Sequence, residues 1–407
     1  MKRFIPSVIF ILLVATTAIG VIMYSRGYRF NVKEKSVNTT GILSASSYPE
    51  KASLFIDGKL ITATNASTSL APGWYTARIS KEGYQPWEEK IRIQGEVVTQ
   101  LDALLVPSNP SLRALTVSGV LNPSFSSDGS KVAFVIPEDA SQSASLTPKA
   151  GIWTMELRNG ALGNRPEPRA IYQPLAKLDW SSAKILWSPD NQELLLLFIR
   201  KDNKAKETVT SALRLIADSD NLTPTEVTSI YDRIISGWEL DQKEKTDTSL
   251  TSLPPTLSTF LTDTTDEIHF SPDDTKILYH ATGSATLATI VTPPVIGSNS
   301  TPETRSITKG NYYVYDRKED RNYLVAESSD IADPSRIKWY TDSKNIVMIE
   351  KVSIYIIDYD GNNKRAVYTG PFEDGIVYPW QSGGRLIILT SFNNPQTYPN
   401  FYEVDLR

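Results

Sequence analysis

The sequence predicts a protein whose folded region is all β, and three observations support this fold class. Short runs rich in Val, Ile, Tyr and Trp, separated by polar turns, recur from Pro107 to Arg407. A shorter segment before them, Gly41 to Val106, alternates apolar and polar residues with the two-residue period of strands. An uncharged apolar run, Phe4 to Tyr24, precedes both. The chain therefore divides into one apolar helix and two β regions.

Composition limits the classes of function. The chain has 407 residues, of which 40% are apolar and 22% are charged, as in ordinary globular proteins. Its net charge of -4 argues against a nucleic-acid partner, because phosphate binding needs a basic field. With no Cys and only two His, disulfides and thiolate nucleophiles are excluded, and a catalytic triad or a His-built metal site is hard to assemble. We expect no cofactor.

The N-terminal run is predicted to be a membrane anchor. A short tail, Met1 to Arg3, precedes Phe4 to Tyr24, which as a helix is long enough to cross a bilayer. A cleaved signal peptide and a buried core helix are the alternatives. The run is longer than the usual apolar region of a signal peptide, and no clear Ala-x-Ala site follows it. The polar residues Ser25 to Thr40 then form a short stalk.

Gly41 to Val106 is predicted to be a compact β module, because turn residues such as Asp57-Gly58 and Pro72-Gly73 separate its alternating runs. Its landmarks are Pro49-Glu50 with Ala52, Ile56-Asp57-Gly58, Leu70 to Tyr75 and Gly83-Tyr84. In these residues the segment resembles the PEGA domain family, with Lys51 standing where the family motif has Gly. This resemblance implies a small β-sandwich of extracytoplasmic and surface proteins, a spacer or adhesive module with no known chemistry.

Residues 107–407 are predicted to form a β-propeller, because one unit of strand, polar turn and strand recurs five times. A third strand follows each copy, and a fourth follows four of them. Arg113 to Thr116, upstream of the first copy, is expected to supply the missing outer strand and close the ring. Five blades are favoured. A sixth is possible between Arg233 and Thr265, which we interpret as a loop because it lacks the turn motif. The copies are aligned on Phe125, Trp187, Phe270, Trp339 and Trp380.

Two features mark the repeats: the Ser-Pro-Asp turns that follow an aromatic residue, as at Ser188-Pro189-Asp190, and the run from Ile354 to Arg365. In both features the repeats resemble the TolB-like, WD40-like propeller repeats of bacterial envelope proteins. This resemblance implies the fold, but such propellers host binding, lyase and peptidase-associated roles alike.

One face of the ring is the candidate binding face. In a four-stranded blade, the turns between strands one and two and between strands three and four lie on one face, and the other connections lie on the opposite face. The long connections belong to the opposite face, where loops on a rigid scaffold often bind partners. The alternative is that they are merely tolerated insertions. The candidate loops are Pro137 to Gly151, Arg200 to Ser211, Arg233 to Thr265, Ala281 to Asn311 and Ser391 to Asn400.

Residue types that suggest chemistry have structural explanations. The Ser-Pro-Asp turns fix blade geometry. Asp358 to Asn362 lacks the spacing of a calcium loop. His269 is a candidate to line the channel, but it has no second His or clustered carboxylate in sequence. No nucleophile elbow, phosphate loop or dinucleotide fingerprint occurs. We therefore assign no catalytic, cofactor or metal residues.

The sequence predicts a membrane-anchored binding or scaffold protein of the bacterial cell envelope, with a protein or cell-wall glycan partner. The alternatives are a carbohydrate-active enzyme similar to polysaccharide lyases and an inert structural adaptor. Arg26, Arg29, Lys33 and Lys35 would place the folded region in the cytoplasm by a strict count of charges. Large folded domains cross membranes largely regardless of flanking charge. Because the PEGA-like module is typical of extracytoplasmic proteins, we expect a single-pass protein of the cell membrane with its folded domains outside.

Overall fold

The computed structural model describes residues 5–25, 28–31, 36–137, 150–159, 167–174, 178–201, 207–293, 299–331, 333–373, 375–392, 394 and 398–407. Helix α1 (Ile5–Ser25) is followed by a pair of antiparallel strands, β1 (Tyr28–Asn31) and β2 (Ser36–Thr39). The structure describes the side chains of α1 from residue 9 to residue 23. Within the described residues, no helix is both long and apolar enough to span a membrane. The membrane anchor therefore stays a prediction.

The predicted sandwich module has two sheets. One has the order β6-β3-β9, formed by β3 (Gly41–Tyr48), β6 (Ala66–Leu70) and β9 (Val98–Leu104). The other has the order β5-β4-β7-β8, formed by β4 (Ser53–Ile56), β5 (Lys59–Ala63), β7 (Gly73–Ser80) and β8 (Trp87–Ile93). Alternate residues of both sheets, such as Leu43, Leu54 and Ile91, are fully buried in one core.

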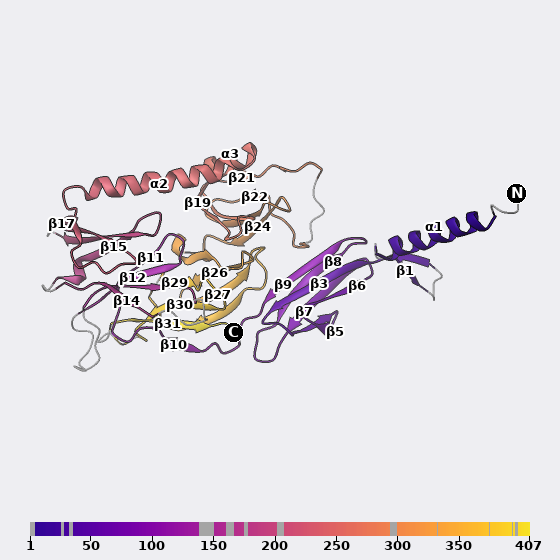
Figure 1. Cartoon of the computed structure of the whole chain (residues 1–407), viewed down its shortest axis with the longest axis horizontal. Coiled ribbons are helices and arrows are strands. Elements are labelled where there is room, and N and C mark those ends of the chain that lie inside the picture. The colour runs from indigo at the N-terminus through magenta and orange to yellow at the C-terminus, as the bar shows by residue number, and fades with distance from the viewer. Residues whose placement is uncertain are drawn as a thin grey trace.

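Five four-stranded antiparallel sheets follow, and we number them blades 1 to 5 (Figure 1). Blade 1 contains β11 (Leu121–Phe125), β12 (Lys131–Ile136), β13 (Gly151–Glu156) and β14 (Arg169–Tyr172). Blade 2 contains β15 (Ala183–Trp187), β16 (Glu193–Lys201), β17 (Glu207–Ile216) and β18 (Thr225–Glu226). Blade 3 contains β19 (Thr265–Phe270), β20 (Lys276–Ala281), β23 (Tyr312–Asp316) and β24 (Arg321–Ala326). Blade 4 contains β25 (Ile337–Trp339), β26 (Asn345–Glu350), β27 (Ser353–Asp358) and β28 (Arg365–Thr369).

Blade 5 is completed by a strand from the start of the propeller, as predicted. It contains β29 (Val377–Pro379), β30 (Arg385–Thr390) and β31 (Asn400–Asp405), and β10 (Leu112–Ala114) pairs with β31 as its outer strand. Arg113 lies opposite Glu403. This pairing joins the two ends of the propeller and covers an otherwise exposed sheet edge.

The aromatic residues of the repeat connect neighbouring blades. The Trp187 indole donates to the carbonyl oxygen of Ser124 in blade 1, and the Trp339 indole donates to that of His269 in blade 3, both at 2.9 Å. Trp380, however, stands one position later than predicted. Its backbone N–H bonds to Arg385 as that of Tyr340 bonds to Asn345, so Trp380 aligns with Tyr340 and not with Trp339.

The predicted loop from Arg233 to Thr265 is wrong, because this stretch forms α2 (Tyr231–Thr251), α3 (Pro255–Thr264) and only a short connection. The helices fill the space between blades 2 and 3. Blade 2 packs one face on blade 1, and α2 covers the other with Tyr231, Ile234, Ile235 and Trp238. Blade 3 packs one face on blade 4, and the other is covered by Leu250, Leu253, Leu257 and Leu261. Figure 1 shows α2 spanning from the side of β17 to that of β21.

The insertion from Ala281 to Asn311 adds to the same packing. Its short strands β21 (Ala285–Thr286) and β22 (Ser306–Ile307) pair, and Leu287 and Ile307 are buried against the face of blade 3 that α3 also covers. Single turns of 3-10 helix, Trp180–Ser182 and Pro334–Arg336, precede blades 2 and 4. In the described part of the chain the ring thus consists of five blades, with helices and this insertion between blades 2 and 3.

The sandwich module docks on the face of the propeller that carries the short turns, which we call the turn face. The Trp87 indole donates to the Asp358 carboxylate at 2.7 Å, and the Asp102 carboxylate pairs with the Lys344 amine at 2.6 Å. Arg365 binds the other oxygen of Asp358 at 2.9 Å and donates to the backbone carbonyl of Leu104. Since Trp87 is only 2% exposed, the two domains share a buried junction.

The raised pKa values of Glu89 and Asp358 at this junction predict that stability depends on pH. Burial, together with the charges of Asp360 and Asp358, raises the pKa of Glu89 to about 8, and burial raises the pKa of Asp358 to about 7. An unfolded chain releases these protons near pH 4, whereas the folded protein keeps them. The free energy of unfolding should therefore fall as the pH rises from about 4 to about 8.

Glu89→Gln should flatten that fall, measured as the urea midpoint at several pH values. Glu88→Gln is the matched control, because Glu88 is exposed beside it on β8. A Glu89→Gln protein with the full pH slope of the unmodified protein would contradict this prediction.

Candidate functional site

The contacts of the docked module described above all lie on the turn face, and we call the opposite face of the propeller the open face. It carries the connections between the second and third strands and those between blades. The module covers part of the turn face through Trp87, Asp102 and Leu104. This opposite face carries the loops that the sequence analysis named as the candidate binding face, and their binding role stays a prediction.

The structure describes two of the five candidate loops largely or completely and the other three only in part. Most of Pro137 to Gly151, the middle of Arg200 to Ser211 and several residues of Ser391 to Asn400 lie outside the described residues, so their predicted role remains untested. Arg233 to Thr265 is helical and packed between blades. Ala281 to Asn311 reaches around blade 3 to the turn face, where Ser300 accepts a hydrogen bond from the backbone of Arg92 at 2.8 Å. The role of these two segments in binding a partner therefore stays a prediction.

A hollow lies on the open face between blades 4 and 5. It has a volume of about 410 Å³, within the range of ligand pockets. Lys351 and Val352 at the end of β26, Thr369 to Glu373 after β28, and Thr390 with Ser391 at the end of β30 line it.

Two exposed apolar side chains stand on the same face. Val352 is 59% exposed and Phe392 is 47% exposed. Phe392 follows Ser391 at the end of β30, and its ring meets the Tyr402 ring edge-on at a centroid distance of 4.9 Å. Its φ of 51° is unfavourable for a bulky residue, and its backbone N–H donates to the Thr390 hydroxyl at 2.9 Å. An aromatic held outward at a conformational cost suggests a contact residue.

A polar cluster occupies the centre of the ring, where the first strands of the blades approach one another. We call Glu267, His269, Lys338 and Tyr378 the central cluster. His269 Nε2 lies 3.6 Å from the Glu267 carboxylate. Lys338 donates to the carbonyl oxygens of Val377 and Gly375 at 3.1 and 3.2 Å, and its amine lies 3.9 Å from the centre of the Tyr378 ring.

The surroundings of the central cluster lower the pKa values of both of its basic side chains, His269 and Lys338. The His269 side chain is 51% exposed to water, but it lies within the ring with protein on most sides. This partial burial disfavours the charged imidazole and lowers the pKa of His269. Glu267 opposes the shift, and the charge of Lys338 adds to it. Burial also lowers the pKa of Lys338 to about 8. A neutral imidazole beside a carboxylate and a lysine of lowered pKa can bind an anionic group or transfer a proton.

The sequence contained a signal for this cluster. The repeat Ile268-His269-Phe270 is in register with Ile337-Lys338-Trp339, so the alignment places Lys338 where blade 3 has His269. Glu267 is harder to place, because a bulge between Asp266 and His269 breaks the alternation and Glu267 has a φ of 48°. The second histidine, His280, contacts the Asp266 carboxylate at 2.6 Å. Among the described residues, no group of three or more His, Asp or Glu is placed to hold a metal ion.

Fold and faces together define a class: a β-propeller held by a docked β-sandwich module. The module is a PEGA domain, since residues 40–109 match the PEGA domain family, which confirms the predicted resemblance. No curated protein sequence matches the chain.

Solved structures similar to the chain include two TolB proteins and a lyase. TolB from Acinetobacter baumannii is 13% identical with a TM-score of 0.18, covering 81% of this chain and 59% of its own length. A putative TolB from Agrobacterium tumefaciens is 12% identical with a TM-score of 0.17, covering 88% and 99%. Oligogalacturonate lyase from Vibrio parahaemolyticus is 10% identical with a TM-score of 0.23, covering 91% and 90%. The chain spans less than two thirds of the first of these proteins.

Proposed function

We propose that the protein is a binding protein of the bacterial cell envelope, in which the PEGA domain holds the propeller by its turn face and the open face binds a partner. The observation that carries the proposal is the buried junction around Trp87 and Asp358, which fixes the two domains to each other through the turn face. The exposed Val352 and Phe392 favour an envelope protein over a cell-wall glycan as the partner.

The test is capture of envelope proteins by the full chain, compared with a variant that carries Val352→Glu and Phe392→Glu. Burying two carboxylates in an apolar contact is costly, so the variant should retain less than about a tenth of the captured partner. Leu222→Glu is the matched control, because Leu222 is 91% exposed in the connection between β17 and β18, on the turn face. Equal capture by both variants, or retention by isolated cell wall instead of protein, would overturn the assignment.

We propose further that Phe4 to Tyr24 anchors the protein in the cell membrane with both folded domains outside. The uncharged apolar sequence and the PEGA domain support this arrangement. Protease treatment of intact cells should then remove both domains. Complete protection of the propeller, with an intracellular control protein also protected, would contradict it.

The central cluster favours a second candidate function, a polysaccharide lyase-like enzyme. His269 with its lowered pKa and Lys338 with its pKa of about 8 supply the basic groups that abstraction of a proton beside a uronate carboxylate requires. In this case the full chain would release unsaturated sugars from uronate polysaccharides, and His269→Ala would abolish the release. No product above background would exclude uronate lyase activity.

A further inference from the structure

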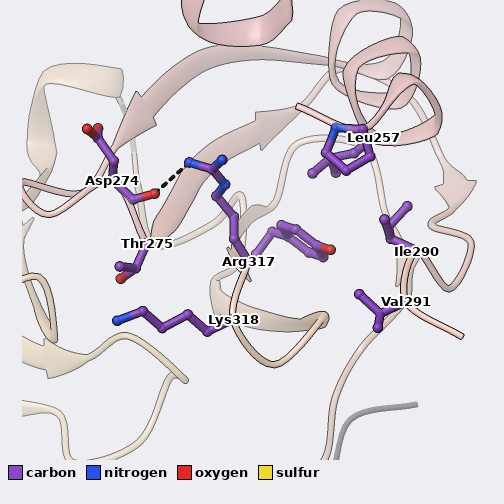
Figure 2. A pocket seen from close by; sticks show the side chains of 9 residues that line it. Leu257, Asp274, Thr275, Ile290, Val291, Arg317 and Lys318 are labelled. Carbon is purple, nitrogen blue, oxygen red and sulfur yellow. Dashed lines mark hydrogen bonds between the residues drawn. The ribbon is translucent and has the colours of Figure 1, made fainter. Parts of the chain in front are cut away.

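A second pocket lies away from the open face, between α3, the insertion after β20 and the turns of blade 3. Figure 2 shows it, and its volume is about 380 Å³. Four separate segments line it: Pro254 and Leu257; Ile290 and Val291; and, from blade 3, Asp274 with Thr275 and Tyr315 with Arg317 and Lys318. Neither the docked PEGA domain nor the central cluster contributes a residue.

One side of this pocket is apolar and held in place. Leu257 is 1% exposed and Tyr315 is 2% exposed, so both are fixed by packing. The Asp320 carboxylate accepts the backbone N–H groups of Ile290 and Val291 at 2.8 and 2.9 Å. The same carboxylate accepts the Tyr315 hydroxyl at 2.8 Å. The apolar wall is therefore positioned before any ligand binds, which reduces the entropy lost on binding.

The other side carries positive charge. Arg317 donates one N–H to the carbonyl oxygen of Asp274 at 2.7 Å, which fixes its guanidinium. In Figure 2 the Asp274 carboxylate points away from Arg317, and the Lys318 side chain extends past Thr275. Within the described part of the chain, neither Arg317 nor Lys318 has an acidic side chain within 4.0 Å in an ion pair. Because a guanidinium has five N–H donors, most of those of Arg317 remain available for an anion.

We propose that this pocket binds a small organic carboxylate with an apolar body. The planar guanidinium matches a carboxylate in two parallel hydrogen bonds, and Lys318 adds a second cation at the rim. The body of the ligand lies against Leu257, Ile290 and Val291. A sugar is a poorer match, since this wall offers its hydroxyl groups no partners, whereas an apolar group gains from leaving water. The inference goes beyond the proposed function, because the pocket is on neither the open face nor the junction.

The test uses the full chain and 3-phenylpropionate as the probe, with binding followed by titration calorimetry. Saturable binding is expected. 3-Phenylpropanol, which has the same body without the charge, and acetate, which has the charge without the body, should each bind at least about tenfold more weakly.

Three variants locate the binding. Arg317→Gln should weaken binding about tenfold by removing the charged donor. Val291→Glu should also weaken binding about tenfold, because its carboxylate repels that of the probe. Because Val291 is 38% exposed, this substitution should leave the protein folded. Arg233→Gln is the charge-matched control, since Arg233 is exposed on α2 outside the pocket.

Two results would overturn the proposal. The first is the absence of saturable binding by the unmodified chain. The second is binding that the alcohol matches or that neither Arg317→Gln nor Val291→Glu weakens. Retained far-ultraviolet circular dichroism and an unchanged urea midpoint in Val291→Glu would show that weaker binding there does not come from unfolding.

Discussion

Replacing Arg365 by leucine is expected to lower the free energy of unfolding by about 3–5 kcal/mol at pH 9, above the Asp358 pKa of about 7, because it leaves the buried Asp358 carboxylate without its cation. Arg365 is 5% exposed and binds Asp358 at 2.9 Å. It also donates to the carbonyl oxygen of Leu104, at the end of the PEGA domain. One side chain therefore supports both blade 4 and the junction. Urea denaturation followed by tryptophan fluorescence measures the loss.

Two further variants separate the lost cation from lost packing. Arg365→Leu combined with Asp358→Asn should be more stable than Arg365→Leu alone, because the neutral amide needs no cation and its oxygen still accepts the Trp87 indole. Arg158→Leu is the control: the Arg158–Glu156 pair is well exposed, at 63% and 44%, so its loss should barely move the midpoint. An Arg365→Leu protein as stable as Arg158→Leu would show that this pair does not hold the junction.

Truncating Leu261 to alanine is expected to cost about 2–5 kcal/mol, the range for a buried leucine. Leu261 is 0% exposed and belongs to the core that joins α3 to Tyr279 and Tyr313 of blade 3. This core covers a blade face that has no neighbouring blade against it. The cavity left by the truncation would therefore weaken the packing of α3 against blade 3. The urea midpoint again measures the effect.

Leu240→Ala is the matched control, because Leu240 lies on α2 but is 64% exposed. Its midpoint should stay within about 0.5 kcal/mol of the unmodified protein. Equal effects of Leu261→Ala and Leu240→Ala would mean that the helices are attached loosely and do not replace blade-to-blade packing.

The five blades were predictable because each repeats a local pattern. The turn at Asp360-Gly361 is an example: Gly361 has a φ of 85°, a conformation that glycine adopts at little cost. The structure adds a second reason for glycine there, since a Cβ would lie 2.4 Å from the carbonyl oxygen of Leu324 in blade 3. Closure by Arg113 and Ala114 was also predictable, because one strand was missing at the end of the chain and a matching one stood before the first copy.

The helices between blades 2 and 3 were missed, although a pattern existed. Tyr231, Ile234, Ile235 and Trp238 recur with helical spacing. The Ser- and Thr-rich composition around Thr248 suggested a loop, because most of α2 faces water and only one stripe is apolar. Propensity in such a stretch is weak, and burial against blades 2 and 3 decides the outcome.

The sequence by itself determined the elements that depend on neighbours along the chain: the strands, the Ser-Pro-Asp turns, the PEGA domain and the apolar N-terminal run. Only the tertiary structure decided which side chains meet across distant segments. Glu89 faces Asp358, His269 approaches Lys338, and Arg317 shares a pocket with Leu257 through contacts between different elements. The physical reason is that a strand's pattern records which face is buried but not which neighbour buries it.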